Sequence, residues 1–211
     1  MLTLCAQQSL ASLRDSAHFH WMLLPLLLLV LYAYAEQLAG QRWSVLLGAL
    51  TFWLMDCNYE IFNALLARLS GFAPLWATPG ASAWGLLIGL NSEISLMFAI
   101  MGLLAMRLLP ADPQLSLCGM NNRWFFALLN ALLCLLAELL LNRIGALCWD
   151  WRYWNRDAPW LILLLGYLPF FRVAYWVHDM RARRRQWLAV GVLAALAAAA
   201  LALLGVRPGG I

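Results

Sequence analysis

Residues 43–66 read WSVLLGALTFWLMDCNYEIFNALL, an apolar stretch that carries two carboxylates and an asparagine in its second half. A helix that crosses a bilayer needs about 20 mostly apolar residues, and this stretch is long enough. Asp56, Glu60 and Asn63 follow one another at intervals of four and three residues. At about 100° per residue they fall within an arc of about 60°, so they share one face of a helix. The stretch predicts a membrane helix with a polar face.

The rest of the chain has the composition of a membrane protein. Apolar residues make up 64% of the 211 residues and charged residues 11%. In soluble domains about 45–50% of the residues are apolar and roughly 25% are charged. A chain with so few polar residues cannot cover a water-soluble globule, so we expect an all-α, polytopic transmembrane helical bundle.

Hydropathy divides the chain into about six spanning helices in a single domain, 21–206. A flank (1–20) precedes this domain and a short tail (207–211) follows it. A tryptophan stands at or near the start of each predicted span, as in the aromatic belt at membrane interfaces. The last span is nearly pure alanine and leucine, so we expect it at the periphery. The predicted spans are 21–38, 43–66, 84–109, 123–142, 160–179 and 187–206.

All 14 basic residues are arginines. The lack of lysine excludes a retinal Schiff base and a lysine-dependent phosphate loop. The net charge of +4 comes largely from a run at Arg181, Arg183, Arg184 and Arg185. Such a run beside a span is typical of a cytoplasmic flank. It favours an arrangement with both termini outside the cytoplasm, in a bacterial inner membrane.

The five cysteines are scattered, without a CxxC pair, and support neither a disulfide framework nor a zinc cluster. The first twenty residues lack the pattern of a signal peptide, so we expect them to stay on the chain. The segments 67–82 and 143–159 are the two long connections. With six spans they lie on the same side of the membrane.

Several polar side chains lie at predicted membrane depth, where ionisable groups are costly and usually functional. We expect a pocket among the second to fifth spans, roofed by the aromatic segment 143–159. The candidate catalytic acids are Asp56, Glu60, Glu93 and Glu138. The candidate substrate-binding residues are Asn63, Asn142, Arg172, Tyr175, Trp149 and Trp151.

Four carboxylates in this pocket would face one arginine, Arg172. Burial and neighbouring carboxylates disfavour the ionised form, so at least one acid should carry a proton near neutral pH. A protonated acid is suited to proton donation. The alternative is that these polar groups only join helices by hydrogen bonds.

The motifs of common membrane enzymes are absent: HExxH, a GxSxG-type nucleophile and paired aspartates. Oxygen ligands on Glu60, Glu93 and Glu138 would suit Mg²⁺ or Ca²⁺. No metal-binding motif accompanies them, so we predict no metal site and no cofactor. The three histidines are scattered along the chain, and this favours roles for them in the flank or at the membrane interface.

The segment Cys57-Asn58-Tyr59-Glu60-Ile61-Phe62-Asn63-Ala64-Leu65 resembles the second-helix acid motif of small integral-membrane terpene cyclases of fungal meroterpenoid pathways. In that family a Cys-Asn pair precedes a Glu, which Ile, two variable residues and Ala-Leu follow. The resemblance implies a proton-donor role for Glu60, with Asp179 as a loose match to the family's second acid. This chain departs from the pattern in the spacing between Asn and Glu and in its number of helices.

Two functions follow from these observations. The first is a membrane enzyme that acts on a lipid-soluble, isoprenoid-like substrate by acid catalysis from intramembrane carboxylic acids. The second is a small proton- or cation-coupled transporter, and a membrane scaffold subunit is a third option. The expected partners are membrane lipid and a hydrophobic small molecule, without nucleic acid.

Overall fold

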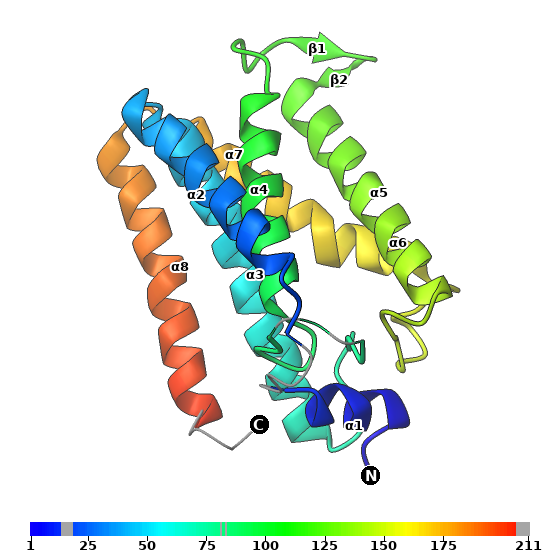
Figure 1. Ribbon diagram of the computed structural model, residues 1–211. Coiled ribbons are helices and arrows are strands. Elements are labelled where there is room, and N and C mark those ends of the chain that lie inside the picture. Colours follow the sequence, from blue (N-terminus) through cyan, green and yellow to red (C-terminus); the bar gives the residue numbers. More distant parts are fainter. Residues whose placement is uncertain (14–18, 81, 83, 206–211) are drawn as a thin grey trace.

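The computed structural model describes residues 1–13, 19–80, 82 and 84–205. The protein is an all-α helical bundle (Figure 1). Four helical segments are long and apolar enough to cross a membrane: Trp43–Ser70, Asn122–Arg143, Pro159–His178 and Arg183–Leu204. The predicted tail, 207–211, lies outside the described residues.

Helix α3 (Trp43–Ser70) is the centre of the bundle. It packs against α4 (Ser92–Arg107), α7 (Leu168–His178) and α8 (Arg183–Leu204), and it touches α2 (Leu23–Ala39). Gly102 of α4 allows close approach, because an added Cβ would lie 3.0 Å from the Ala49 carbonyl oxygen. Phe52 of α3 packs between Phe98, Phe170 and Phe171 in the main apolar core.

Helix α8 lies on the outside of the bundle, along one flank of α3 (Figure 1). Only 17% of its most apolar window is buried. This placement agrees with the sequence from Leu188 to Leu204, which is mostly alanine and leucine and has no polar side chain that must be kept from lipid.

Helix α5 (Asn122–Arg143) packs against α7 and against the segment before it. That segment consists of α6 (Pro159–Leu161) and a π-helix, η1 (Ile162–Tyr167), which continues directly into α7. Pro169 lacks the N–H that an α-helix would use at this point, and wide turns of this kind occur where the regular ladder is interrupted. The predicted fifth span is thus one continuous segment with a π-helical turn in its first half.

The predicted third span, 84–109, is helical only from Ser92 to Arg107. Asn91 ends the bent, irregular segment before it and caps the helix, because its Oδ1 accepts a hydrogen bond from the Ile94 N–H at 2.8 Å. Hydropathy did not reveal this boundary, since residues 84–90 are as apolar as the helix itself. At the opposite membrane side a small hairpin, β1 (Ser116–Leu117) with β2 (Met120–Asn121), leads into α5.

The first residues form α1 (Leu4–Ala11), a short helix within the predicted flank. Ala6 is fully buried and packs in a cluster with Ile61 and Ala64 of α3. A disulfide joins Cys5 of α1 to Cys148, which contradicts the expectation that the cysteines form none. The partners are 143 residues apart, so their spacing in the sequence gave no sign of the bond.

The two long connections meet at the end of the bundle that carries α1. Ala77 and Cys148 exchange two backbone hydrogen bonds, of 3.1 and 2.9 Å. The Trp151 indole N–H donates to the Ala73 carbonyl at 3.0 Å. The segment 143–159 is therefore ordered against its neighbours.

An ion pair fastens α5 to α7 at the opposite side. The Arg123 guanidinium donates two hydrogen bonds of 2.8 Å to the carboxylate of Asp179, which directly follows the spanning segment that ends at His178. The His178 Nδ1 lies 2.9 Å from the same carboxylate. Burial raises the pKa of Asp179, but the bonds from Arg123 and His178 outweigh burial and lower the pKa to about 2.

Replacing Cys5 by Ser should lower the free energy of unfolding by about 2–4 kcal/mol, because the disulfide closes a very long loop. The measurement is thermal unfolding in detergent. Cys118→Ser is the control, since Cys118 is an exposed free cysteine. Equal unfolding midpoints for the two variants would contradict a stabilising bond.

Acid should also lower the stability of the folded protein, because Asp179 loses its negative charge when it is protonated. Its pKa is lower in the folded protein than in the unfolded chain, so its contribution is complete above about pH 4 and is lost as the pH falls toward 2. Unfolding midpoints of the wild type and of Asp179→Asn should differ at pH 6 and converge near pH 2. A constant difference between them across this range would refute the assignment.

Candidate functional site

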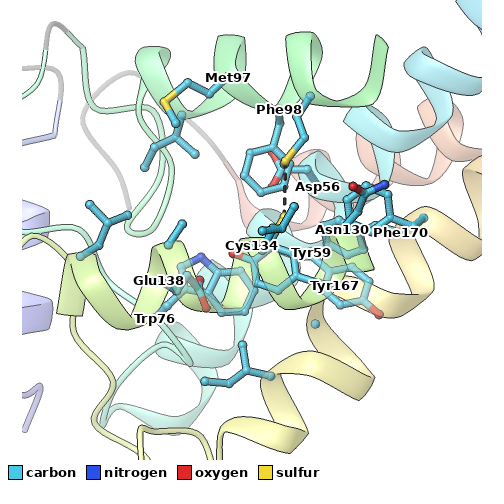
Figure 2. Close-up of a pocket in the computed structure, with 18 of the residues that line it drawn as sticks. Asp56, Tyr59, Trp76, Met97, Phe98, Asn130, Cys134, Glu138, Tyr167 and Phe170 are labelled. Carbon is cyan, nitrogen blue, oxygen red and sulfur yellow. Dashed lines mark hydrogen bonds between the residues drawn. The ribbon is translucent and has the colours of Figure 1, made fainter. Parts of the chain in front are cut away.

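A cavity of about 560 Å³ lies between α3, α4, α5 and the segment that contains η1 and α7. Its wall is mostly apolar and aromatic. Three of the four predicted catalytic acids line it: Asp56, Glu60 and Glu138. They are close enough to one another to interact electrostatically. Figure 2 shows Glu138 beside Trp76, with Asp56 farther along the cavity.

Asp56 and Glu60 come from the polar face of α3, and each is only 3% exposed. One turn of helix separates them, so both point into the bundle, as their common arc predicts. The Asp56 Oδ2 and Glu60 Oε2 atoms are buried and have no hydrogen-bond partner among the described residues. Buried polar atoms are normally paired, so these oxygens are available to a ligand or a proton.

Trp76 holds the other oxygen of Glu60, because its indole N–H donates to Glu60 Oε1 at 2.8 Å. Asn63 holds Trp76 in turn. The Asn63 Oδ1 accepts from the Leu75 N–H at 2.6 Å, and its Nδ2 donates to the Trp76 carbonyl at 2.8 Å. Asn63, predicted to bind substrate, does not line the cavity and instead positions the segment that carries Trp76.

Gly89 brings the segment before α4 against this cluster. A Cβ at Gly89 would lie 2.6 Å from Trp76 Nε1, 2.7 Å from Asn63 Nδ2 and 2.7 Å from Glu60 Oε2. No side chain fits there without displacing these atoms. The glycine therefore allows the backbone to close one end of the cavity directly over Glu60.

Glu138 lies on α5, across the cavity from α3, and its Oε2 has no partner among the described residues. The Tyr167 hydroxyl lies next to this carboxylate. Tyr167 is the last residue of the π-helix, and Gly166 beside it also lines the cavity. π-Helical turns occur often at functional sites, where they redirect side chains.

The structure does not bring the other predicted residues to the cavity wall. Glu93 stands in the first turn of α4, where the Ser92 hydroxyl donates to it at 2.9 Å. Asn142 donates to the Leu147 carbonyl at 2.9 Å. Tyr175 is fully buried behind Asn130, whose Nδ2 donates to the Tyr175 hydroxyl at 2.8 Å.

Arg172 does not face the carboxylates as expected. Its guanidinium lies over the Trp124 ring, 4.0 Å from the ring centre, in a cation–π contact. Phe170 and Phe171 occupy the cavity face of α7, so the next residue points toward α5.

Trp149 and Trp151 pack in an aromatic cluster with Trp154, and of these three only Trp154 reaches the cavity.

Sequence reasoning missed Trp76, Tyr167 and Gly89. Trp76 lies in one of the two long connections, away from the span starts, and the sequence pattern gave it no role. Tyr167 reaches the site through a helical turn that the sequence pattern does not show. Within the described part of the chain, no group of three His, Cys, Asp or Glu side chains is arranged to hold a metal ion.

Gly89→Ala should break the hydrogen bond between Trp76 and Glu60, because the added methyl group occupies the space of both atoms. We expect a loss of about 1–3 kcal/mol in stability and a change in tryptophan fluorescence. Gly80→Ala is the matched control, since an added Cβ there meets nothing within 4 Å. Unchanged fluorescence in Gly89→Ala would show that the segment can move away without affecting the site.

Comparison with known proteins corrects the expected relation to terpene cyclases. An uncharacterized protein of Archaeoglobus fulgidus is 44% identical over 195 residues, which cover 92% of both chains. A second uncharacterized protein of that organism is 49% identical over 47 residues, 22% of this chain and 84% of its own. No solved structure matches.

These relatives are archaeal and give no support to a bacterial inner membrane. Neither these relatives nor the family model links the chain to terpene cyclases, so the motif around Glu60 is a short local resemblance. Its supposed second acid, Asp179, is paired with Arg123 and does not line the cavity. Residues 3–206 match the model of the "Uncharacterized membrane protein family", and the chain belongs to that family of membrane proteins.

Proposed function

We propose that the cavity binds a lipid-soluble substrate and that Glu60 acts on it as a general acid. The observation that carries this proposal is the pair of buried, unpartnered carboxylate oxygens on Asp56 and Glu60 in an apolar cavity. A purely structural carboxylate would have its hydrogen bonds satisfied by the protein. Leaving such atoms unpaired is costly and is expected where a ligand or a proton completes the site.

The arrangement around Glu60 suits proton donation. Trp76 occupies Oε1, and the buried Oε2 has no hydrogen-bond partner among the described residues. When Glu60 gives up its proton, the indole N–H still donates to the resulting carboxylate and stabilises it. A bond to a buried charged acceptor is stronger than one to a neutral acceptor, so this contact favours the transfer.

A second carboxylate completes the cycle. Glu60 transfers its proton to the substrate, and Glu138 removes a different proton from a substrate carbon. The proton on Glu138 then returns to Glu60 through the neighbouring carboxylates and solvent. One proton is given and one is taken, so a rearrangement or elimination of this kind needs no cofactor.

The alternative of proton transport receives less support from the cavity wall. Toward the end of α4 that lies opposite α1, the wall carries Leu104, Leu108 and Leu133. Proton relays through membranes use chains of ionisable or hydrated groups. Here the acids gather at one end of an apolar chamber, an arrangement suited to holding a substrate.

The function is tested by deuterium transfer. Purified protein is incubated in D₂O with a membrane lipid extract, and mass spectrometry identifies any lipid that gains deuterium at carbon. Reversal of the carbon deprotonation step should produce such a species with the wild type. Glu60→Gln removes the titratable proton but keeps the shape, and transfer should fall by about 10²–10⁴-fold.

Glu36→Gln is the matched control, because Glu36 is an exposed carboxylate that pairs with Arg42 and Arg107 outside the cavity. Its deuterium transfer should equal that of the wild type. Asn130→Ala should instead lower stability and keep residual transfer, since Asn130 holds Tyr175. Full transfer in Glu60→Gln would assign that glutamate to helix packing alone.

A further inference from the structure

The cavity opens sideways between α4 and α5. Several residues that line it are also exposed on the outer surface: Met97 and Leu104 on α4, Leu108 directly after α4, and Leu133 and Leu141 on α5. Helix α4 packs mainly on α2 and α3, whereas α5 packs on η1 and α7. Helix α5 is long and apolar enough to cross a membrane, so an apolar opening along it faces the acyl chains of the bilayer and the route into the cavity begins in lipid.

One side-chain contact spans this opening. The Cys134 thiol lies 3.4 Å from the Met101 sulfur, and Figure 2 marks this contact with a dashed line between the two helices. A thiol is a weak donor and a thioether a weak acceptor. The opening is therefore crossed by a flexible contact that costs little to displace.

The shape of the cavity suits one extended chain. Its lining residues run from Ile94, in the first turn of α4, to Leu108, which directly follows the helix. At 1.5 Å per residue this is a length of about 21 Å along the helix. The volume of about 560 Å³ is that of a site for one small ligand. The acids stand nearer the Ile94 end, beside the segment that carries Trp76, so a chain would extend from them toward Leu108.

The charges at the acidic end select the head group. No arginine or histidine belongs to the part of the cavity wall that the structure describes. Asp56, Glu60 and Glu138 each present an oxygen without a partner there. Where an acid is ionised, its free oxygen accepts hydrogen bonds and needs a donor from the ligand, whereas a protonated Glu60 donates its own proton. A phosphate or carboxylate head would bring more acceptors and negative charge into a low-dielectric site, where repulsion is strong.

We propose that the substrate is a single-chain lipid whose head group donates hydrogen bonds and carries no negative charge, and that it enters from the bilayer between α4 and α5. This inference rests on the proposed function and adds to it the substrate class and the route of entry. An alcohol and an amine share the required chemistry. In both, the donor satisfies the free oxygen of one carboxylate and places the reacting end within reach of Glu60.

The test is photolabelling of the protein in lipid nanodiscs with four probes of equal chain length. Each probe carries a diazirine in the chain and ends in an alcohol, an amine, a carboxylate or a methyl ether. We expect the alcohol or the amine to label α4 and α5 at least tenfold more than the carboxylate and the ether. Equal labelling by the carboxylate or the ether would overturn the assigned head group.

The route of entry is tested with two variants on α5. Leu133 and Leu136 are both exposed on the surface of this helix, but only Leu133 lines the cavity. Leu133→Trp should reduce labelling by the preferred probe severalfold, whereas Leu136→Trp should leave it unchanged. Labelling at the wild-type level in Leu133→Trp would refute entry between α4 and α5.

Labelling needs no turnover, so this inference and the proposed function can fail separately. If deuterium transfer depends on Glu60 while the carboxylate probe labels equally well, the substrate class is wrong and the proton transfer stands. If the alcohol or amine probe is preferred while Glu60→Gln transfers deuterium normally, the substrate class stands and the acid role of Glu60 is wrong.

Discussion

The arrangement of the bundle depends on keeping the carboxylates of α3 away from lipid. Ionisable groups in the hydrocarbon region cost several kcal/mol unless they face the protein interior. Asp56 and Glu60 share one face of α3, so that face must be covered by other helices. Helix α4, α5 and the segment containing η1 and α7 enclose it, and α8 covers another flank. The same constraint that makes α3 central also creates the acidic end of the cavity.

Much of this could be predicted from the sequence, because it follows from the repeat of a single helix. The periodicity of Asp56, Glu60 and Asn63 placed them on one buried face, and all three are buried. The lack of polar residues from Leu188 to Leu204 placed α8 at the periphery, where it lies. Patterns of this kind depend on about 100° per residue and on the cost of polar groups in lipid, which need no knowledge of the neighbouring helices.

The parts that could not be predicted depend on which distant segments meet. Trp76 reaches Glu60 through the backbone of a loop fixed by Asn63, and Cys5 meets Cys148 across most of the chain. Arg172 was expected to neutralise a cavity acid, yet the ion pair forms between Arg123 and Asp179. Charge counting along the spans gives the number of charges, but pairing depends on the rotation of each helix. On α7, Phe170 and Phe171 face the cavity, whereas Arg172, at the next position, lies over the ring of Trp124.

The distribution of arginine itself bears on what the cavity acids do. The chain contains 14 arginines, and Asp179 shows that a carboxylate placed for structure receives one, with two bonds of 2.8 Å. The three acids of the cavity receive none from the described residues of its wall. A paired carboxylate would be held in its ionised form and would lose the capacity to carry a proton. Unpaired acids in an apolar chamber remain able to exchange protons and to accept hydrogen bonds from a ligand. The lack of a cation among the described residues of the cavity wall therefore distinguishes these acids from Asp179 and supports the proposed proton transfer.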